Sequence, residues 1–227
     1  MSFSSIKSEN ASRFTEVQVY LNYITSVEPL APDLFVPLEV KIMRGLFYVH
    51  LYAAIEKSVN ELVQITIMLI NSKRVQNNHY TLVFNTISKM DKIKAINDCG
   101  SQNTLNKSIE LFNHIGSRNI SDINETIFSN KLQNIWIRNV EEIILAFGIN
   151  NLHIEPRERA TIDEVVDKRN AVAHGRESAT YVGERHRVEV LRDKLDISQN
   201  FIAKLIDAFE YFYENKNYLK PAVKKKY

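Results

Sequence analysis

The segment DKRNAVAHG, residues 167–175, places an arginine, an asparagine and a histidine close together along the chain. These residues are Arg169, Asn170 and His174, and the histidine directly precedes Gly175. An arginine binds anions through its planar guanidinium, and a histidine gains and loses protons near neutral pH. The dipole of a helix that ends at Gly175 would favour the protonated imidazole. The segment therefore suits a site that binds an anion and moves a proton.

Arg169 is expected to emerge from an apolar face of its helix. Positions three and four residues away from it, in both directions, share its face. They are occupied by Val165, Val166, Val172 and Ala173. A guanidinium among apolar side chains is costly without an anionic partner, so the site must supply one.

A second polar anomaly interrupts the long helix expected from Leu38 to Asn71. Apolar residues recur there every three or four positions, and Glu56 and Asn60 break this stripe at its centre. The full stripe is Leu38, Ile42, Leu46, Val49, Ala53, Glu56, Asn60, Val63, Ile67 and Ile70. An inward carboxylate needs a cation, so we expect Glu56 to pair with Arg169. The pair could also be purely structural, and His174 could simply end its helix.

The elements that position these residues are expected to be helices. Pro37 suits the start of the long helix because its missing N–H needs no partner there. Thr161, with Glu164 three residues later, resembles a capping box and predicts a short helix from Thr161 to His174. Periodicity predicts further helices over about 14–24, 105–115, 132–147 and 188–212. The sequence thus indicates an all-α bundle, although Tyr80–Phe84 could form a short strand.

Composition excludes several classes of protein. The chain has 227 residues, with six glycines, five prolines and one cysteine. So little glycine and proline argues against collagen-like, low-complexity and turn-rich β chains. One cysteine excludes a disulfide framework and a zinc site built from cysteines, and it suits a reducing compartment. The sequence shows neither a signal-peptide pattern nor an apolar run of membrane-spanning length, so we expect a cytoplasmic protein without a membrane segment.

Charge is informative mainly through its distribution. The net charge of +2 is not typical of a protein that coats nucleic acid. Residues 71–120 carry seven Lys or Arg against three Asp or Glu, so a polyanion could dock there, although a solvated surface explains the excess as well. We expect one domain over residues 1–227, with a polar insert at about 72–103 and a basic, flexible tail at about 219–227.

Two stretches of the chain resemble a known superfamily. DKRNAVAHG matches the R-x4-to-6-H motif of the HEPN superfamily, including the polar residue after the arginine and the small residue before the histidine. RGLFYVHLYAAIEKSVNEL, residues 44–62, is similar to the long helix of HEPN proteins in prokaryotic toxin and phage-defence loci. The resemblance covers these two helices well and the layout of the others loosely. It implies an antiparallel helical bundle of the HEPN type with a polar insert in the middle.

The resemblance also implies a metal-independent endoribonuclease that needs no cofactor. RNA would be cleaved by attack of its own 2′-hydroxyl on the adjacent phosphate. His174 would be the general base or acid, and Arg169 would hold the phosphate and its developing charge. Asn170 would position a phosphate oxygen or orient the histidine. Glu56 would support Arg169.

Further implications concern the surroundings of the motif. Lys168 and Arg176 could contact RNA. Arg169 and His174, five residues apart, point about 140° away from each other on an ideal helix. A homodimer with two motifs facing one cleft would relieve this misalignment, as would a loosened last turn at Gly175.

Three functions follow from these features. The first is a homodimeric ribonuclease that acts as a toxin or anti-phage effector and is restrained by an antitoxin or other regulatory partner. The second is a non-catalytic HEPN-like module for dimerisation or nucleotide binding in a defence complex. The third, a helical antitoxin or adaptor, requires that the motif be coincidental.

Overall fold

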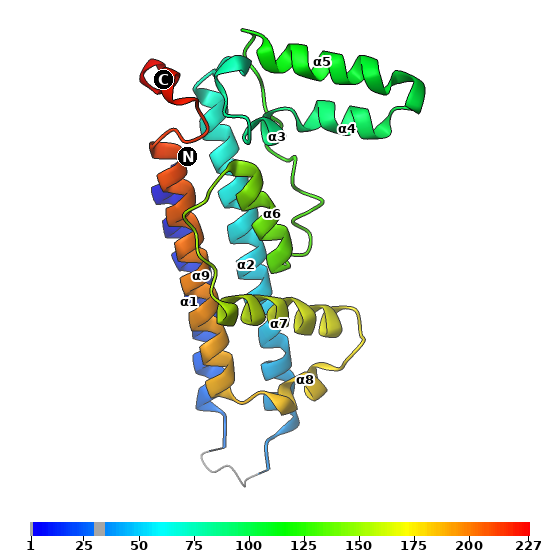
Figure 1. Ribbon diagram of the computed structural model, residues 1–227. Helices are drawn as coiled ribbons and strands as arrows, with labels where there is room; N and C mark the ends of the chain where they lie inside the picture. Colours follow the sequence, from blue (N-terminus) through cyan, green and yellow to red (C-terminus); the bar gives the residue numbers. More distant parts are fainter. Residues whose placement is uncertain (1, 30–34) are drawn as a thin grey trace.

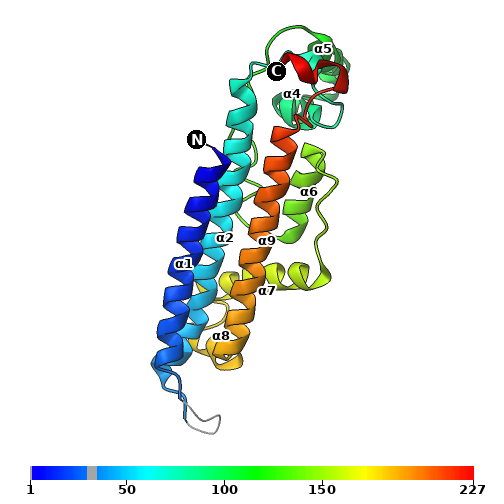
Figure 2. The same ribbon diagram turned by 90° about the vertical axis from the view of Figure 1, so that its left-hand side faces the viewer.

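Three long helices run side by side along the molecule (Figures 1 and 2). They are α1 (Phe3–Ser26), α2 (Leu38–Ser72) and α9 (Val188–Glu214) in a computed structural model that describes residues 2–29 and 35–227. Within these residues every regular element is helical, and β-type pairing is limited to two isolated bridges. The predicted all-α fold is therefore confirmed.

The expected apolar faces of α1 and α9 form the core. The α1 residues Phe14, Val17, Leu21 and Ile24 are all buried, and α9 buries Leu191, Leu195, Ile202, Leu205 and Phe209. Both helices pack against α2, which lies between other elements over most of its length. Burial of these side chains removes apolar surface from water, and this is the main force that holds the bundle together.

The stripe expected on α2 is not the buried face in the first half of that helix. Leu46 is 42% exposed and Ala53 is exposed, whereas Phe47, Tyr48 and Leu51 are fully buried. The expectation was wrong because α2 contacts α1, α7, α8 and α9 and is therefore apolar on several sides, so spacing alone does not select one face. Along the line Leu46, Val49 and Ala53, the first and last side chains are exposed and Val49 is half-buried.

Three shorter helices cover one side of the long ones: α6 (Ile137–Phe147), α7 (Pro156–Ala173) and α8 (Ala179–Arg185) (Figure 1). The start expected for α7 at Thr161 is wrong, because Pro156 occupies its first turn and Glu155 and Glu158 form its capping box. α6 begins at Ile137, so Leu132 lies before the helix. As expected, α6 ends at Gly148, which is left-handed with φ +80°.

The helix α8 lies directly on α2. A Cβ atom added to Gly45 of α2 would lie 2.0 Å from the carbonyl oxygen of Ala179, and one added to Gly183 of α8 would lie 1.8 Å from the carbonyl oxygen of Lys41. Only glycine permits so close an approach of two backbones. The contact fixes the loop after α7 and thereby the end of that helix.

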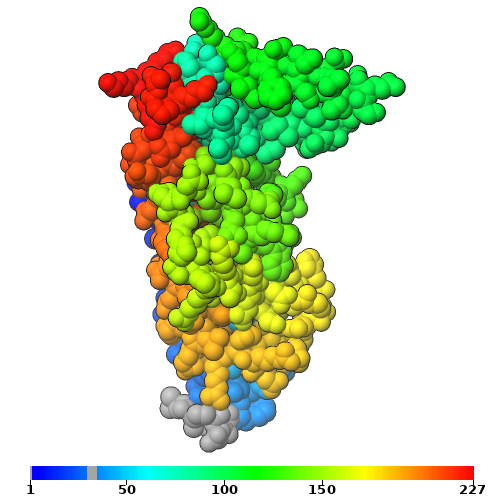
Figure 3. All heavy atoms as spheres, in the orientation of Figure 1, coloured from blue at the N-terminus to red at the C-terminus, as the bar shows by residue number. Residues whose placement is uncertain are grey.

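The middle of the chain forms a helical arm at one end of the molecule (Figures 1 and 3). The polar segment 72–103 contains the 3-10 helices η1 (Asn77–His79) and η2 (Ser101–Asn103) and the helices α3 (Asn85–Ser88) and α4 (Met90–Asp98). The arm continues through α5 (Thr104–Gly116), and neither α4 nor α5 buries a residue. The strand considered at 80–84 does not form. Tyr80 pairs with Leu219 in an isolated bridge.

The basic tail, expected to be flexible, contacts the rest of the fold in the structure. Its 3-10 helix η3 (Pro221–Lys226) follows the buried Leu219, and Lys220 donates its backbone N–H to the carbonyl of His79 at 2.9 Å. The hydroxyl of Tyr227 lies 2.8 Å from Nδ1 of His79. Several ammonium groups of the tail donate to backbone carbonyls. Lys224 donates to Asn215 at 2.7 Å.

None of the helices in the described part of the chain is long and apolar enough to cross a membrane.

Candidate functional site

The helix α7 presents Arg169 to the long helix α2. The guanidinium carbon lies 4.0 Å from the centre of the Tyr52 ring, within the range of a cation–π contact. The side chain of Arg169 is 19% exposed. Behind it, Val165 and Val166 are buried as the apolar face predicted. The guanidinium therefore lies at the rim of the core and still reaches solvent.

Polar groups from three parts of the chain surround this guanidinium. Nη1 of Arg169 donates to Oδ1 of Asn170 at 2.6 Å and to Oδ1 of Asn134 at 3.4 Å. Nη2 lies 3.7 Å from Oε2 of Glu56 on α2. This is the ion pair predicted from the two polar interruptions of apolar faces. An aromatic face, two amide oxygens and a carboxylate thus set the orientation of one arginine.

Tyr52 connects α2 to the loop before α6. Its hydroxyl accepts a hydrogen bond from the backbone N–H of Ile135 at 3.2 Å. It lies 3.1 Å from both Oε1 of Glu56 and the carbonyl oxygen of Gln133, so it can donate to either. Burial raises the pKa of Tyr52 to about 12, which keeps the hydroxyl protonated as a donor at neutral pH. Asn60 adds a further anchor, donating to the carbonyl of Leu132 at 3.3 Å.

His174 caps the end of α7 and is exposed. Its backbone N–H donates to the carbonyl of Asn170 at 3.1 Å, and Gly175 follows with φ +68°. Among the hydrogen bonds and ion pairs of the described residues, none involves its imidazole. Within one chain the structure therefore brings together Arg169, Asn170 and Glu56, while His174 faces solvent.

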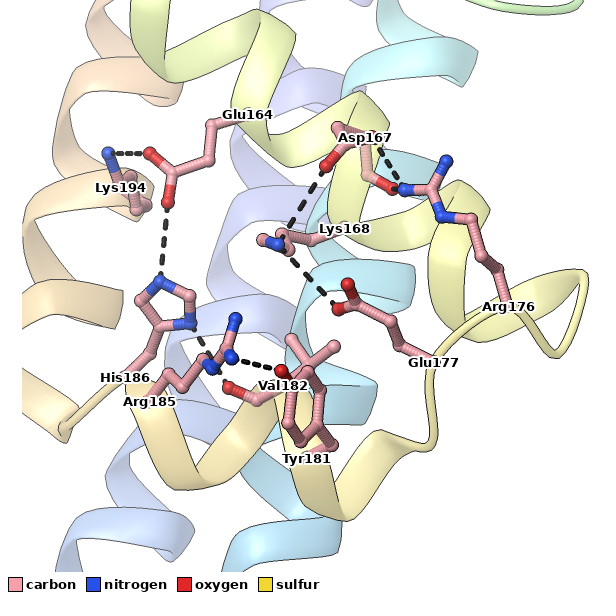
Figure 4. A network of polar contacts seen from close by, with 10 residues as sticks. All are labelled: Glu164, Asp167, Lys168, Arg176, Glu177, Tyr181, Val182, Arg185, His186 and Lys194. Carbon is pink, nitrogen blue, oxygen red and sulfur yellow. Dashed lines mark hydrogen bonds and ion pairs between the residues drawn. The ribbon is translucent and has the colours of Figure 1, made fainter.

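Lys168 and Arg176 take part in a separate charge network beside the motif (Figure 4). Arg176 donates to Oδ1 of Asp167 at 2.7 Å, and this carboxylate holds the pKa of Arg176 above its usual value. Nζ of Lys168 lies 3.8 Å from Asp167 and 3.7 Å from Glu177. Both positive charges are thus balanced by carboxylates of the same chain.

A second network ties α7 to α8 and α9 (Figure 4). Nε2 of His186 lies 3.3 Å from Glu164, and Nδ1 lies 3.1 Å from the carbonyl of Val182. Lys194 of α9 lies 2.6 Å from the other oxygen of Glu164. The hydrogen bond from His186, together with Lys194, lowers the pKa of Glu164 to about 2. This network could not be predicted from sequence, because its members are far apart along the chain.

Sequence reasoning also missed two residues that contact Arg169. Tyr52 lies one turn before Glu56 within the segment 44–62, so its position on α2 was a usable signal. Asn134 lies in a loop, where no periodicity could link it to α7. No group of three or more His, Cys, Asp or Glu side chains within residues 2–29 and 35–227 is arranged to hold a metal ion.

Comparison with known protein families gives a match over most of the chain. The model of the family described as RiboL-PSP-HEPN matches residues 8–215, which includes α2, α7 and the whole site. No curated protein and no solved structure gives a significant match. The chain therefore belongs to the RiboL-PSP-HEPN family of the HEPN superfamily, and this membership supports a nuclease-like or RNA-related role in general.

Proposed function

We propose that this protein is an endoribonuclease that works without a metal ion. The 2′-hydroxyl of the RNA attacks the adjacent phosphate of the same RNA strand. The observation that carries the proposal is the held guanidinium of Arg169 on the same helix as an exposed, unengaged His174, in a chain of the HEPN superfamily. Arg169 would bind the phosphate, since its planar fork matches two phosphate oxygens. His174 would move a proton, and Asn170 would keep Arg169 in place.

The reaction exchanges one bond on phosphorus and moves two protons. The 2′-oxygen bonds to the adjacent phosphorus as its proton passes to a base, and the bond to the 5′-oxygen of the next nucleotide breaks as that oxygen gains a proton. The products are a 2′,3′-cyclic phosphate and a 5′-hydroxyl end. DNA lacks the attacking hydroxyl and is not a substrate.

We include a homodimer in this proposal, because no hydrogen bond or ion pair of the described residues links the imidazole of His174 to the polar groups around Arg169. The surface line through Leu46, Val49 and Ala53 leads along α2 directly to Glu56, which pairs with Arg169. Exposed apolar side chains beside a site are typical of an interface. We propose that a second copy packs on this line and contributes its own His174 to the Arg169 site of the first.

The proposal extends to the biological role of the protein. An active ribonuclease is hazardous to the cell that makes it, which favours a toxin or anti-phage effector restrained by an antitoxin or other partner in the cytoplasm. Lys168 and Arg176 are candidate RNA contacts, and Arg176 is the more exposed of the two.

A non-catalytic HEPN-like module is the second candidate, and the Glu56 carboxylate favours it. Because Glu56 already balances the charge of Arg169, the pair could serve structure alone. The two candidates differ in what His174 does. A module does not need an exposed imidazole at the end of α7.

The test is cleavage of RNA by the purified protein in EDTA, with analysis of the product ends. We expect 2′,3′-cyclic phosphate ends from the wild type and a loss of at least about 100-fold in Arg169→Ala and His174→Ala, the scale of general acid–base catalysis. Arg118→Ala and His153→Ala change exposed residues of the same types elsewhere and should retain activity. Absence of cleavage by the folded wild type, with equal tolerance of wild type and His174→Ala on expression, would support the module.

A further inference from the structure

The loop Leu132–Ile135 is fixed at its base and open at its tip. Leu132 and Ile135 are buried, and α2 holds the backbone through Asn60 and Tyr52. Gln133 and Asn134 between them are exposed. The bonds from α2 give the tip a defined position beside Arg169, which is unusual for an exposed loop segment.

The amide of Asn134 has only one orientation that suits Arg169. A guanidinium carries donors and no acceptor, so the amide must turn its oxygen toward Nη1, as the distance of 3.4 Å to Oδ1 indicates. Its NH₂ group then points away from the guanidinium. No hydrogen bond from this NH₂ group occurs among the described residues. Asn134 therefore offers two free N–H donors beside the proposed phosphate site.

We propose that Asn134 is a specificity-determining residue that reads a base next to the cleaved phosphate. The inference rests on the proposed ribonuclease function. A nucleotide whose phosphate contacts Arg169 carries its base among the side chains around that guanidinium, and single-stranded RNA exposes base edges to such contacts. Asn170 also turns its oxygen to Arg169, but it is half-buried on α7, whereas Asn134 is exposed.

The free donors of Asn134 select bases by their functional groups. Uracil O4 and guanine O6 accept hydrogen bonds, whereas the amino groups of cytosine and adenine donate at the corresponding positions. A residue that only donates at these positions favours uracil and guanine, provided that the neighbouring acceptors of cytosine (N3) and adenine (N1 and N7) lie out of its reach. One neutral hydrogen bond gives roughly a threefold to tenfold preference.

The experiment sequences the ends produced from a randomised RNA by three variants and the wild type. The ends produced by the wild type should be enriched about threefold to tenfold in uracil and guanine at one position flanking the cut. Asn134→Ala should lose the enrichment and keep its melting temperature. Asn134→Asp, which can only accept, should turn the preference toward cytosine and adenine. Asn113→Ala, an exposed asparagine on α5, should match the wild type.

The outcomes separate this inference from the function on which it rests. Cleavage by the wild type with a base preference that Asn134→Ala and Asn134→Asp leave unchanged would overturn the role of Asn134 and leave the ribonuclease intact. Cleavage without any preference for uracil and guanine would do the same. If the wild type cleaves no RNA in any condition, the proposed ribonuclease function is wrong. The proposed role of Asn134 in base specificity is then wrong as well.

Discussion

Arg169 has five N–H donors, and the hydrogen bonds described for it leave from Nη1 alone. Glu56 lies 3.7 Å from Nη2, close enough to balance charge and longer than a normal hydrogen bond. The guanidinium is therefore neutralised and oriented while donors on Nη2 and Nε are left for a ligand. A purely structural ion pair would more often use the bidentate geometry that satisfies both partners.

Tyr52 allows the ring contact and the hydroxyl contact to be separated by substitution. Tyr52→Phe keeps the ring under Arg169 and removes the hydroxyl that Ile135 and Gln133 use. We expect the free energy of unfolding to fall by about 1–3 kcal/mol, because buried polar groups lose their partner. Urea unfolding measures the change.

The control for Tyr52→Phe is Tyr23→Phe on α1, where the side chain is 57% exposed. This variant should unfold as the wild type does. Equal stability of both variants and the wild type would show that the hydroxyl of Tyr52 does not hold the loop.

The site could be predicted from sequence only where residues departed from an apolar pattern. Glu56 and Arg169 each interrupted an apolar face, so burial and charge required a pair, and the structure places them 3.7 Å apart. Tyr52 fits the apolar pattern of a buried helix, so the sequence did not distinguish the role of its hydroxyl from that of other buried tyrosines. The position of Asn134 beside Arg169 depends on the course of its loop, which is determined by tertiary packing.

Among the elements, α7 shows why local signals can mislead. Thr161 and Glu164 have the spacing of a capping box, yet the helix begins at Pro156, one and a half turns earlier. Glu164 instead points toward His186 and Lys194 (Figure 4). A carboxylate predicted to cap its own helix thus joins α7 to α8 and α9, and this assignment required the packing of three elements.

This junction predicts a pH dependence of stability. Because the pKa of Glu164 is lowered from 4.5 to about 2 in the fold, the ionised carboxylate stabilises the protein above pH 4.5. That contribution is lost as the pH falls from 4.5 toward 2. Between pH 5 and pH 3 the free energy of unfolding should therefore fall more steeply for the wild type than for Glu164→Gln.

Urea unfolding at several pH values tests this expectation. Glu16→Gln changes an exposed carboxylate on α1 and should follow the wild-type pH profile. If Glu164→Gln also follows that profile, the pairing of Glu164 with His186 and Lys194 contributes nothing to folding in acid.

At the scale of the whole molecule, the contacts of the carboxyl-terminal segment could not be predicted from composition. Four lysines within residues 220–226 indicated a solvated end. In the structure Lys220 donates to the carbonyl of Asn78 at 2.8 Å, and Tyr227 reaches His79. The helical layout was predictable because periodicity is local, whereas this contact joins parts of the chain about 150 residues apart.

In the proposed homodimer, the arrangement of the two chains decides whether Arg169 and His174 act together. If each site takes Arg169 from one chain and His174 from the other, a purified heterodimer of Arg169→Ala with His174→Ala contains one intact site. Its activity should be about half that of the wild-type dimer, although both variant homodimers are inactive. Co-expression with two different affinity tags supplies the heterodimer, and cleavage of RNA in EDTA measures its activity.

A reciprocal heterodimer makes the test decisive. Pairing a wild-type chain with the double variant Arg169→Ala/His174→Ala leaves no intact site if the two residues come from different chains. The same heterodimer keeps one intact site, and about half of the activity, if both residues act within one chain. The imidazole of His174 is exposed, and the hydrogen bonds of Arg169 go to Asn170 and Asn134 rather than to His174, so we expect the reciprocal heterodimer to be inactive.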